Sequence, residues 1–262
     1  MSVNGFAGRV RSREKLVGYW ITLDVPPVAE RIARLGYDYV VLDGQHGLLG
    51  YQGLMTGLLA IDAGAAIGPR PTAGLVRVEA NDPTPIGRAL DAGATGVIVP
   101  LIDTADDVAR AVRAAKYPPA GVRSFGPMRA SLRIGPVPAD SNAQTVVLAM
   151  IETPLGLKNV AEICATPGLD GVYVGPSDLG LALGARFPGD PEIEGPFEEA
   201  LELIARTAQE AGIAAGIHTF DGDSANLRIE QGYTFATVAS DLSHLEASAA
   251  AHLETARQSF PS

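Results

Sequence analysis

Short apolar runs alternate with segments of helical spacing along the whole chain. Eight of these runs are short and mostly apolar, which is typical of strands buried on both faces of a parallel sheet. The predicted strands span residues 16–23, 37–43, 73–79, 95–100, 145–152, 169–175, 213–218 and 234–240. Eight strands separated by helices favour a (β/α)8 TIM barrel, an α/β fold, over an open doubly wound sheet, which is the main alternative.

The segments between the runs carry signals that start and stop helices. Residues 26–36 have Pro near the start and Gly at the end. Residues 104–118 begin with Thr and early acids and carry Arg and Lys late, and residues 195–212 repeat this order. Residues 241–260 form a predicted last helix with a long alanine-rich face. That helix either closes the barrel or packs on another subunit.

Two segments interrupt this alternation. Residues 117–144 are rich in Pro, Gly, Ser and Arg, and residues 184–195 form a second predicted loop. A long loop in a compact fold is usually functional or mobile. No break in composition marks a second domain, so we expect residues 1–262 to form one barrel domain.

Composition narrows the class of protein. With 262 residues, 47% of them hydrophobic, the chain can bury a full core. Its net charge of −10 and the absence of a basic run argue against nucleic-acid binding. The single cysteine, Cys164, excludes an internal disulfide and favours a reducing compartment. Without an apolar signal core or a long apolar run, we expect a cytoplasmic protein with no membrane span.

Polar residues follow several predicted strands, at the end where parallel α/β folds gather their functional groups. These residues are Asp43, His46, Arg77, Glu152, Asp178 and His218. Ordinary structural roles are alternatives for most of them, since acids often cap helices or turns and a surface ion pair would explain Arg77. Glu152 is harder to explain in this way, because it follows a buried run and a buried unpaired carboxylate is costly.

Together these residues indicate one kind of chemistry. Two carboxylates on neighbouring strand ends suit a hard divalent cation such as Mg²⁺ or Mn²⁺, which can also bind a substrate oxygen. The helix start in "GPSDLG" offers backbone N–H groups to an anion. A guanidinium stabilises an oxyanion, and a histidine beside an aspartate moves protons near neutral pH. This combination suits formation of an enolate from a 2-oxo acid.

Longer motifs carry a family resemblance over almost the whole chain. They are "GYDYVVLDGQHG", "VRVEANDPTPIGRALDAGATGVIVPLIDT", "KYPPAGVRSFGPMRAS" and "IETPLGLKNVAEICATPGLDGVYVGPSDLGLALG", in this order. With these motifs the sequence resembles the HpcH/HpaI aldolases, class II metal-dependent pyruvate aldolases with a (β/α)8 barrel. The resemblance implies that Glu152 and Asp178 bind the metal. It also implies that Gly175 and Ser177 offer backbone amides to the pyruvate carboxylate, and that Arg77 binds the keto or enolate oxygen.

The resemblance assigns further roles outside the metal site. His46, supported by Asp43, would be the acid–base group, directly or through a water molecule. Asp91 matches an aspartate that reaches the site of a neighbouring subunit. Family members are commonly hexamers, built as trimers of dimers that exchange their last helix, so residues 241–260 would be the exchanged segment.

The sequence departs from the family pattern in three places. Gln45 stands where the family often has Glu, which would change the basicity of His46 or a neighbouring contact. Met150 replaces a common Gln two residues before Glu152, so a polar contact near the metal or pyruvate would be lost. The stretch "GVRSFGPMRAS" replaces a more common Arg-Gly start, so Ser124 and Phe125 would reshape the aldehyde pocket.

The expected activity is reversible cleavage of a 4-hydroxy-2-oxo acid to an aldehyde and pyruvate, or a related 2-oxo acid such as hydroxypyruvate. The cofactor would be Mg²⁺ or Mn²⁺, with Co²⁺ a further candidate. Acyl-CoA cleavage and oxaloacetate decarboxylation are alternatives that use the same enolate. Arg123, Arg129 and Arg133 are weak candidates for binding the phosphates of CoA.

Two further alternatives do not involve a metal enolate. A Schiff-base aldolase needs a lysine at a strand end, and none of Lys15, Lys116 and Lys158 follows a predicted strand. A barrel that only binds a metabolite would not need the Arg, His, Glu and Asp set, although fold alone does not exclude it.

Overall fold

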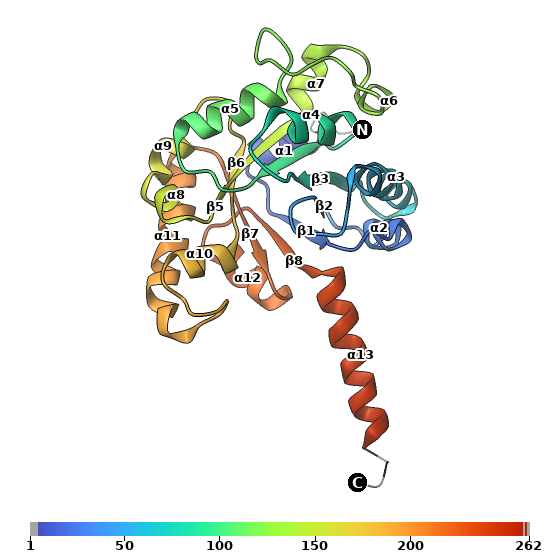
Figure 1. The fold of residues 1–262 in the computed structure, drawn as a ribbon, viewed down its shortest axis with the longest axis vertical. Helices are drawn as coiled ribbons and strands as arrows, with labels where there is room; N and C mark the ends of the chain where they lie inside the picture. The colour runs from blue at the N-terminus through green and yellow to red at the C-terminus, as the bar shows by residue number, and fades with distance from the viewer. Residues whose placement is uncertain (1–4, 259, 261–262) are drawn as a thin grey trace.

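Eight parallel strands close into a barrel in the computed structural model, which describes residues 5–258 and 260 (Figure 1). The strands follow one another in chain order, and β1 pairs with β8 to close the sheet. They are β1 (Leu16–Ile21), β2 (Tyr39–Asp43), β3 (Ala73–Arg77), β4 (Gly96–Val99), β5 (Val146–Ile151), β6 (Gly171–Val174), β7 (Ala214–Thr219) and β8 (Phe235–Ser240). The predicted barrel is confirmed, and an open sheet is excluded.

Helices lie between the strands, and most of them cover the outside of the barrel (Figure 1). They are α1 (Phe6–Arg11), α2 (Pro26–Ala33), α3 (Tyr51–Ile67), α4 (Pro83–Asp91), α5 (Ala105–Ala115), α6 (Ala130–Ile134), α7 (Pro138–Gln144), α8 (Pro154–Lys158), α9 (Val160–Cys164), α10 (Pro176–Ala182), α11 (Glu194–Glu210), α12 (Gly222–Glu230) and α13 (Asp241–Arg257), with a 3-10 turn at Pro191–Ile193. The segment 117–144, predicted as a loop, therefore contains α6 and α7. Pro138 opens α7 because its missing N–H costs nothing at a helix start.

Side chains along each strand alternate between two apolar layers. On β5, Val147, Ala149 and Ile151 pack beneath the outer helices, whereas Val146, Leu148 and Met150 belong to the cluster inside the barrel. The same alternation continues the inner row to Glu152. At the other end of the barrel, Ala7 and Val10 of α1 join the inner cluster and close its floor.

The last helix, α13, projects away from the barrel (Figure 1). Its first residue, Asp241, is buried and accepts hydrogen bonds from the backbone N–H groups of Thr22 and Leu23. Beyond this anchor every residue of the helix is exposed, including Leu245 and Leu253. The sequence predicts that this helix either closes the barrel or packs on another subunit. Within the single chain it does not close the barrel. Within residues 5–258 and 260, no helix is long and apolar enough to cross a membrane.

Candidate active site

A cavity of about 250 Å³ opens at the carboxyl ends of the strands. Five residues predicted from the sequence line it, namely His46, Arg77, Gly175, Ser177 and Asp178. The cavity is also lined by residues to which the sequence analysis gave no role, among them Trp20, Tyr173 and His218. The structure therefore brings together most of the groups predicted from β2, β3 and β6 and adds an aromatic wall.

Arg77 and Asp43 form the central charged pair beneath this cavity. Nε of Arg77 donates to Oδ1 of Asp43 at 2.8 Å, and Nη2 donates to Oδ2 at 2.5 Å. Both residues are buried, and the Arg77 guanidinium carbon lies 5.1 Å from the centre of the Trp20 ring. Two parallel hydrogen bonds fix the guanidinium plane, so its position is set before a substrate arrives.

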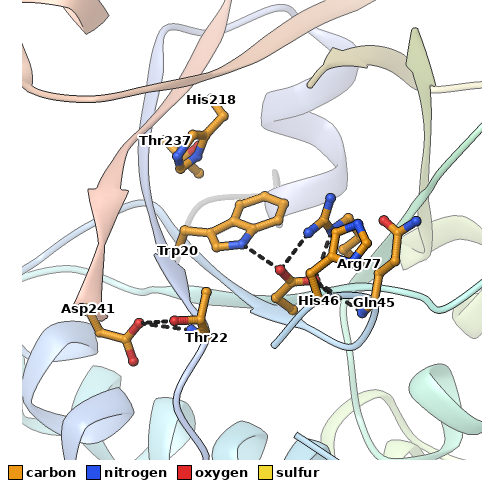
Figure 2. Close-up of polar contacts among 9 residues, drawn as sticks. Trp20, Thr22, Gln45, His46, Arg77, His218, Thr237 and Asp241 are labelled. Carbon is orange, nitrogen blue, oxygen red and sulfur yellow. Dashed lines mark hydrogen bonds and ion pairs between the residues drawn. The ribbon is translucent and has the colours of Figure 1, made fainter. Parts of the chain in front are cut away.

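Asp43 is held by more than its arginine. The indole Nε1 of Trp20 donates to Oδ2 at 3.2 Å (Figure 2). The backbone N–H groups of Gln45 and His46 donate to Oδ1 at 3.1 and 3.2 Å. Burial alone would raise the pKa of the Asp43 carboxyl, but the Arg77 pair and these further donors together lower it. Asp43 therefore remains an anion that binds Arg77 and also caps the turn into His46.

His46 lies on the exposed rim of the cavity. Asp43 contacts its backbone amide, and the structure gives no hydrogen bond between the Asp43 carboxylate and the His46 ring within the described residues. The predicted support of the imidazole by Asp43 thus acts on the turn that carries the ring. At Gln45, where the family often has Glu, the side-chain Oε1 is buried and has no hydrogen-bond partner among the residues described.

Glu152 is the buried carboxylate that follows β5. Its Oε1 accepts a hydrogen bond from the backbone N–H of Leu101 at 2.8 Å. Its Oε2 is buried with no partner in the described part of the chain. Burial raises the pKa of Glu152, the Leu101 bond opposes this, and the negative charge of Asp178 adds to the rise. An unpartnered buried carboxylate oxygen near a second carboxylate calls for a cation or a proton.

Gly175 makes room for this carboxylate. A Cβ at this position would lie 2.5 Å from Oε2 of Glu152 and 2.9 Å from Cε of Met150. The glycine follows β6 in an extended conformation and caps α10, which begins with Pro176. Ser177 and Asp178 in the first turn are exposed toward the cavity. The local sequence therefore places free backbone N–H groups and one carboxylate beside Glu152.

These residues fit a divalent metal. Within residues 5–258 and 260 no group of three or more His, Cys, Asp or Glu side chains is arranged to hold a metal ion. A metal at this site would therefore have only two protein carboxylates, Glu152 and Asp178, beside the start of α10. Two carboxylates with substrate and water oxygens completing the shell are typical of Mg²⁺ and Mn²⁺ sites. The unpartnered Oε2 of Glu152 is the observation that supports this fit.

Asp91 lies away from the cavity of its own chain. It ends α4, at the opposite end of the barrel, and accepts a hydrogen bond from Arg123 at 2.6 Å. Burial raises the pKa of Asp91, although Arg123 opposes the shift. Phe125 lies near this pair, with its ring 5.5 Å from that of Tyr117. Neither Phe125 nor Ser124 lines the cavity in the described chain.

The groups that rival mechanisms would need lie elsewhere. Nζ of Lys116 donates to the carbonyl oxygens of Asn142 and Thr145, before the start of β5 and so at the opposite end of the barrel. Burial lowers the pKa of Lys116 to about 8, but no strand end carries this amine. Arg129 and Arg133 both pair with Asp62.

The aromatic and hydroxyl groups at the top of the barrel were missed by sequence reasoning. Three of these residues face the inside of the barrel, namely Trp20, Tyr173 and Thr237. Each lies two or four residues along its strand from another position that faces inward. His218 was recognised as a strand-end residue but received no role. Strand alternation, extended from the buried aromatic residues, would have predicted that all four face the barrel interior.

A closed parallel barrel with acidic, basic and imidazole groups at the carboxyl ends of its strands defines a barrel enzyme. The chain belongs to the HpcH/HpaI aldolase/citrate lyase family, whose model matches residues 16–248. The predicted resemblance is thus confirmed, and the chain is a carbon–carbon lyase of the aldolase type.

Three relatives illustrate the similarity. The chain is 40% identical over 246 residues to the hydroxypyruvate/pyruvate aldolase of Rhizorhabdus wittichii, covering 94% of this chain and 95% of that protein. It is 36% identical over 253 residues to the 4-hydroxy-2-oxo-heptane-1,7-dioate aldolase of Shigella flexneri, covering 95% and 91%. The crystal structure of an HpcH/HpaI aldolase/citrate lyase family protein from Burkholderia cenocepacia J2315 superposes with a TM-score of 0.87 at 32% identity, covering 97% and 100%.

Proposed function

We propose that this protein reversibly cleaves a 4-hydroxy-2-oxo acid to an aldehyde and a 2-oxo acid, either pyruvate or hydroxypyruvate. The aldolase relatives support this reaction class. The observation that carries the proposal is the buried, unpartnered Oε2 of Glu152, which lies against Gly175, one of the residues that line the same cavity as Arg77. With a divalent cation on Glu152, this arrangement would suit a substrate that brings a carboxylate and a polarisable carbonyl.

The metal would be Mg²⁺ or Mn²⁺, with Co²⁺ a further candidate, held by Glu152 and Asp178. When bound, it would act as a Lewis acid toward the 2-oxo acid. The remaining roles fall to the chain. Backbone amides at Gly175 and Ser177 would bind the substrate carboxylate, and the guanidinium of Arg77, fixed by Asp43, would donate to the oxygen on C2.

Bond cleavage moves one proton and one electron pair. The 4-hydroxyl loses its proton to His46, directly or through a water molecule, as the C3–C4 bond breaks and C4 becomes the aldehyde carbonyl. The electron pair of that bond passes into the C2 carbonyl, and Arg77 stabilises the resulting enolate oxygen. Protonation at C3 then gives the 2-oxo acid, and the reverse sequence gives aldol addition.

Exchange of the C3 protons of pyruvate in D₂O, followed by NMR, tests enolate formation without choosing an aldehyde. Enzyme treated with EDTA should exchange slowly, and added Mg²⁺ or Mn²⁺ should restore exchange. The Glu152→Gln variant is the matched control and should not respond to metal. If exchange is equally fast with and without metal, or if borohydride traps a pyruvate adduct on a lysine, the metal mechanism is wrong.

Among the described residues, no specific contact favours the acyl-CoA alternative. The arginines considered for CoA phosphates, Arg123, Arg129 and Arg133, are paired with carboxylates at the opposite end of the barrel. Oxaloacetate decarboxylation stays a secondary activity of the same enolate chemistry.

The assembly and location are part of the proposal. We infer a homo-oligomer in which α13 crosses to a partner, because this helix exposes Leu245 and Leu253. The family resemblance implies that this oligomer is a hexamer of three dimers. In that arrangement Asp91 would act at a neighbouring site. The acidic composition suits a cytoplasmic protein.

A further inference from the structure

Three residues on neighbouring strands form a hydrogen-bonded row beside the cavity. The phenol of Tyr173 on β6 lies 2.5 Å from Oγ1 of Thr237 on β8. The same Oγ1 lies 2.9 Å from Nδ1 of His218 on β7. Tyr173 and Thr237 are fully buried, and His218 is half-buried at the cavity surface. Figure 2 shows the His218 ring over Thr237, beside the indole of Trp20.

The direction of these hydrogen bonds follows from the inventory of donors. Burial raises the pKa of the Tyr173 phenol far above neutrality, so it keeps its proton. Thr237 is its only hydrogen-bond partner among the described residues, so the phenol must donate to Oγ1 or leave a buried O–H unpaired. The Thr237 hydroxyl then has its own hydrogen free for Nδ1 of His218. Nδ1 is therefore the acceptor.

The imidazole consequently carries its proton on Nε2. Burial, reinforced by the positive charge of Arg77, lowers the pKa of His218 to about 4, so the ring is neutral near pH 7. The ring is held in place by an edge contact with Trp20, at a centroid separation of 5.4 Å. Within the described residues Nε2 has no hydrogen-bond partner. The row thus presents one oriented N–H donor to whatever occupies the site.

His218 stands where two cavities meet. It lines the cavity that holds Arg77 and also a neighbouring cavity of about 300 Å³, and the two share Pro176 and Ser177. The neighbouring cavity has apolar walls that include Phe197, Ile217 and Phe220. A molecule that extends from the first cavity into the second therefore passes His218, with an apolar region beyond it.

We propose that Nε2–H of His218 donates a hydrogen bond to an oxygen on the carbon next to the aldehyde group, so that the enzyme selects 2-hydroxyaldehydes as acceptors. This inference rests on the proposed aldol reaction. The carboxylate and the C2 oxygen of the 2-oxo acid already have assigned partners, at the start of α10 and in Arg77. The acceptor is the reactant left to extend past His218, and its remaining chain lies in the apolar cavity.

A matched pair of aldehydes tests the proposal with pyruvate as donor. Glycolaldehyde carries the 2-hydroxyl, and propanal has a methyl group in its place. The readout is the ratio of kcat/KM for glycolaldehyde to that for propanal, because a general loss of activity cancels. His218→Phe removes the N–H that donates the hydrogen bond and should lower this ratio about tenfold. His218→Gln keeps an N–H of similar reach and should retain most of the preference.

The outcomes separate this inference from the proposed function. Wild-type enzyme that fails the metal-dependent pyruvate exchange refutes the aldolase mechanism itself. Wild-type enzyme that exchanges pyruvate, together with an unchanged aldehyde ratio in His218→Phe, overturns the role of His218 alone. The role is also overturned if His218→Phe lowers kcat/KM for hydroxypyruvate relative to pyruvate but leaves the aldehyde ratio unchanged. His218 would then bind the hydroxyl of the 2-oxo acid and not that of the aldehyde.

The tautomer provides a second test that does not depend on turnover. ¹⁵N NMR of the wild-type protein should show His218 with a bare Nδ1 and a protonated Nε2 near pH 7. Thr237→Val removes the hydroxyl that donates to Nδ1 and should shift protonation toward Nδ1, whereas Thr237→Ser should keep the wild-type pattern. A proton on Nδ1 in the wild-type protein would contradict the proposed row.

Discussion

Arg77 and Asp43 are register partners on β3 and β2, and their side chains meet in a two-point hydrogen-bonded pair at 2.8 and 2.5 Å. The pair is buried, and its other contacts come from Trp20 and from the turn that carries His46. One carboxylate therefore fixes the arginine, the indole and the turn that leads to the proposed acid–base group. Asp43 is a positioning residue in this arrangement.

Removing the charge of Asp43 should destabilise the fold. In Asp43→Asn, Arg77 would remain buried without its counter-charge, and losing one partner of a buried pair typically costs about 3–5 kcal/mol. Urea denaturation would measure this loss. The exposed pair between Arg206 and Glu202, at 3.8 Å, provides the control, and Glu202→Gln should change the free energy of unfolding by less than about 0.5 kcal/mol. Equal effects of the two substitutions would contradict a special role for the buried pair.

The same pair should make stability depend on pH in acid. The folded protein lowers the pKa of Asp43 below its ordinary value of 3.8, so the unfolded chain takes up this proton first as the pH falls. The contribution is therefore complete above the ordinary value and is lost as the pH falls through the lower folded pKa. The difference in unfolding free energy between wild type and Asp43→Asn should be constant above about pH 5 and shrink below about pH 4. A constant difference throughout would show that the charge is not responsible.

Gly175→Ala should damage the site more than the fold. The added Cβ would lie 2.5 Å from Oε2 of Glu152, so the carboxylate must move from the position proposed for metal binding. We expect metal-dependent pyruvate exchange to fall about 100-fold, because misplacing a reacting group by about 1 Å has effects of this size. Gly195→Ala is the control, since a Cβ at Gly195 has nothing within 4 Å. Similar exchange rates in the two variants would refute the steric argument.

Metal should stabilise the wild-type protein through Glu152. After EDTA treatment, Mg²⁺ or Mn²⁺ at about 100 times its dissociation constant should add about 2.7 kcal/mol to the free energy of unfolding. Glu152→Gln should remove most of this gain, while Glu199→Gln, an exposed acid on α11, should keep it. Thermal unfolding with and without metal measures the effect. A full metal response in Glu152→Gln would assign the ligand elsewhere.

The sequence predicted the architecture because its signals are local and repeated. Apolar runs such as "VVLAMI" need burial on both faces, and eight of them separated by helices leave few folds. Strand ends also located Arg77 and Glu152, since charged residues directly after buried strands are costly unless paired or used.

Contacts across the barrel were harder to foresee. Pairing of Arg77 with Asp43 depends on the register of two neighbouring strands, whereas the sequence pattern alone suggested an ion pair at the surface. The row from Tyr173 through Thr237 to His218 joins three strands, and no single motif contains it. Likewise, α6 and α7 lie in a segment whose Pro and Gly content indicated a loop, because Pro at a helix start resembles a loop signal in composition alone.

Complementation between two damaged subunits would test the proposed role of Asp91. If Asp91 acts in a neighbour's site, Asp91→Asn and Glu152→Gln homo-oligomers should each be inactive. Mixed oligomers should contain some sites with an intact Glu152 from one chain and an intact Asp91 from the other. Such sites should restore part of the aldol cleavage activity after co-expression, in proportion to the number of mixed interfaces.

The control for this experiment uses two substitutions in one chain. A subunit carrying both Asp91→Asn and Glu152→Gln, mixed with Glu152→Gln, has no intact Glu152 and should stay inactive. If Asp91 instead acts only through its own chain, by holding Arg123 at 2.6 Å, no mixture of single variants should recover activity. Recovery therefore requires both an oligomer and an Asp91 that reaches across it, and its absence would confine Asp91 to the structural pair seen within one chain.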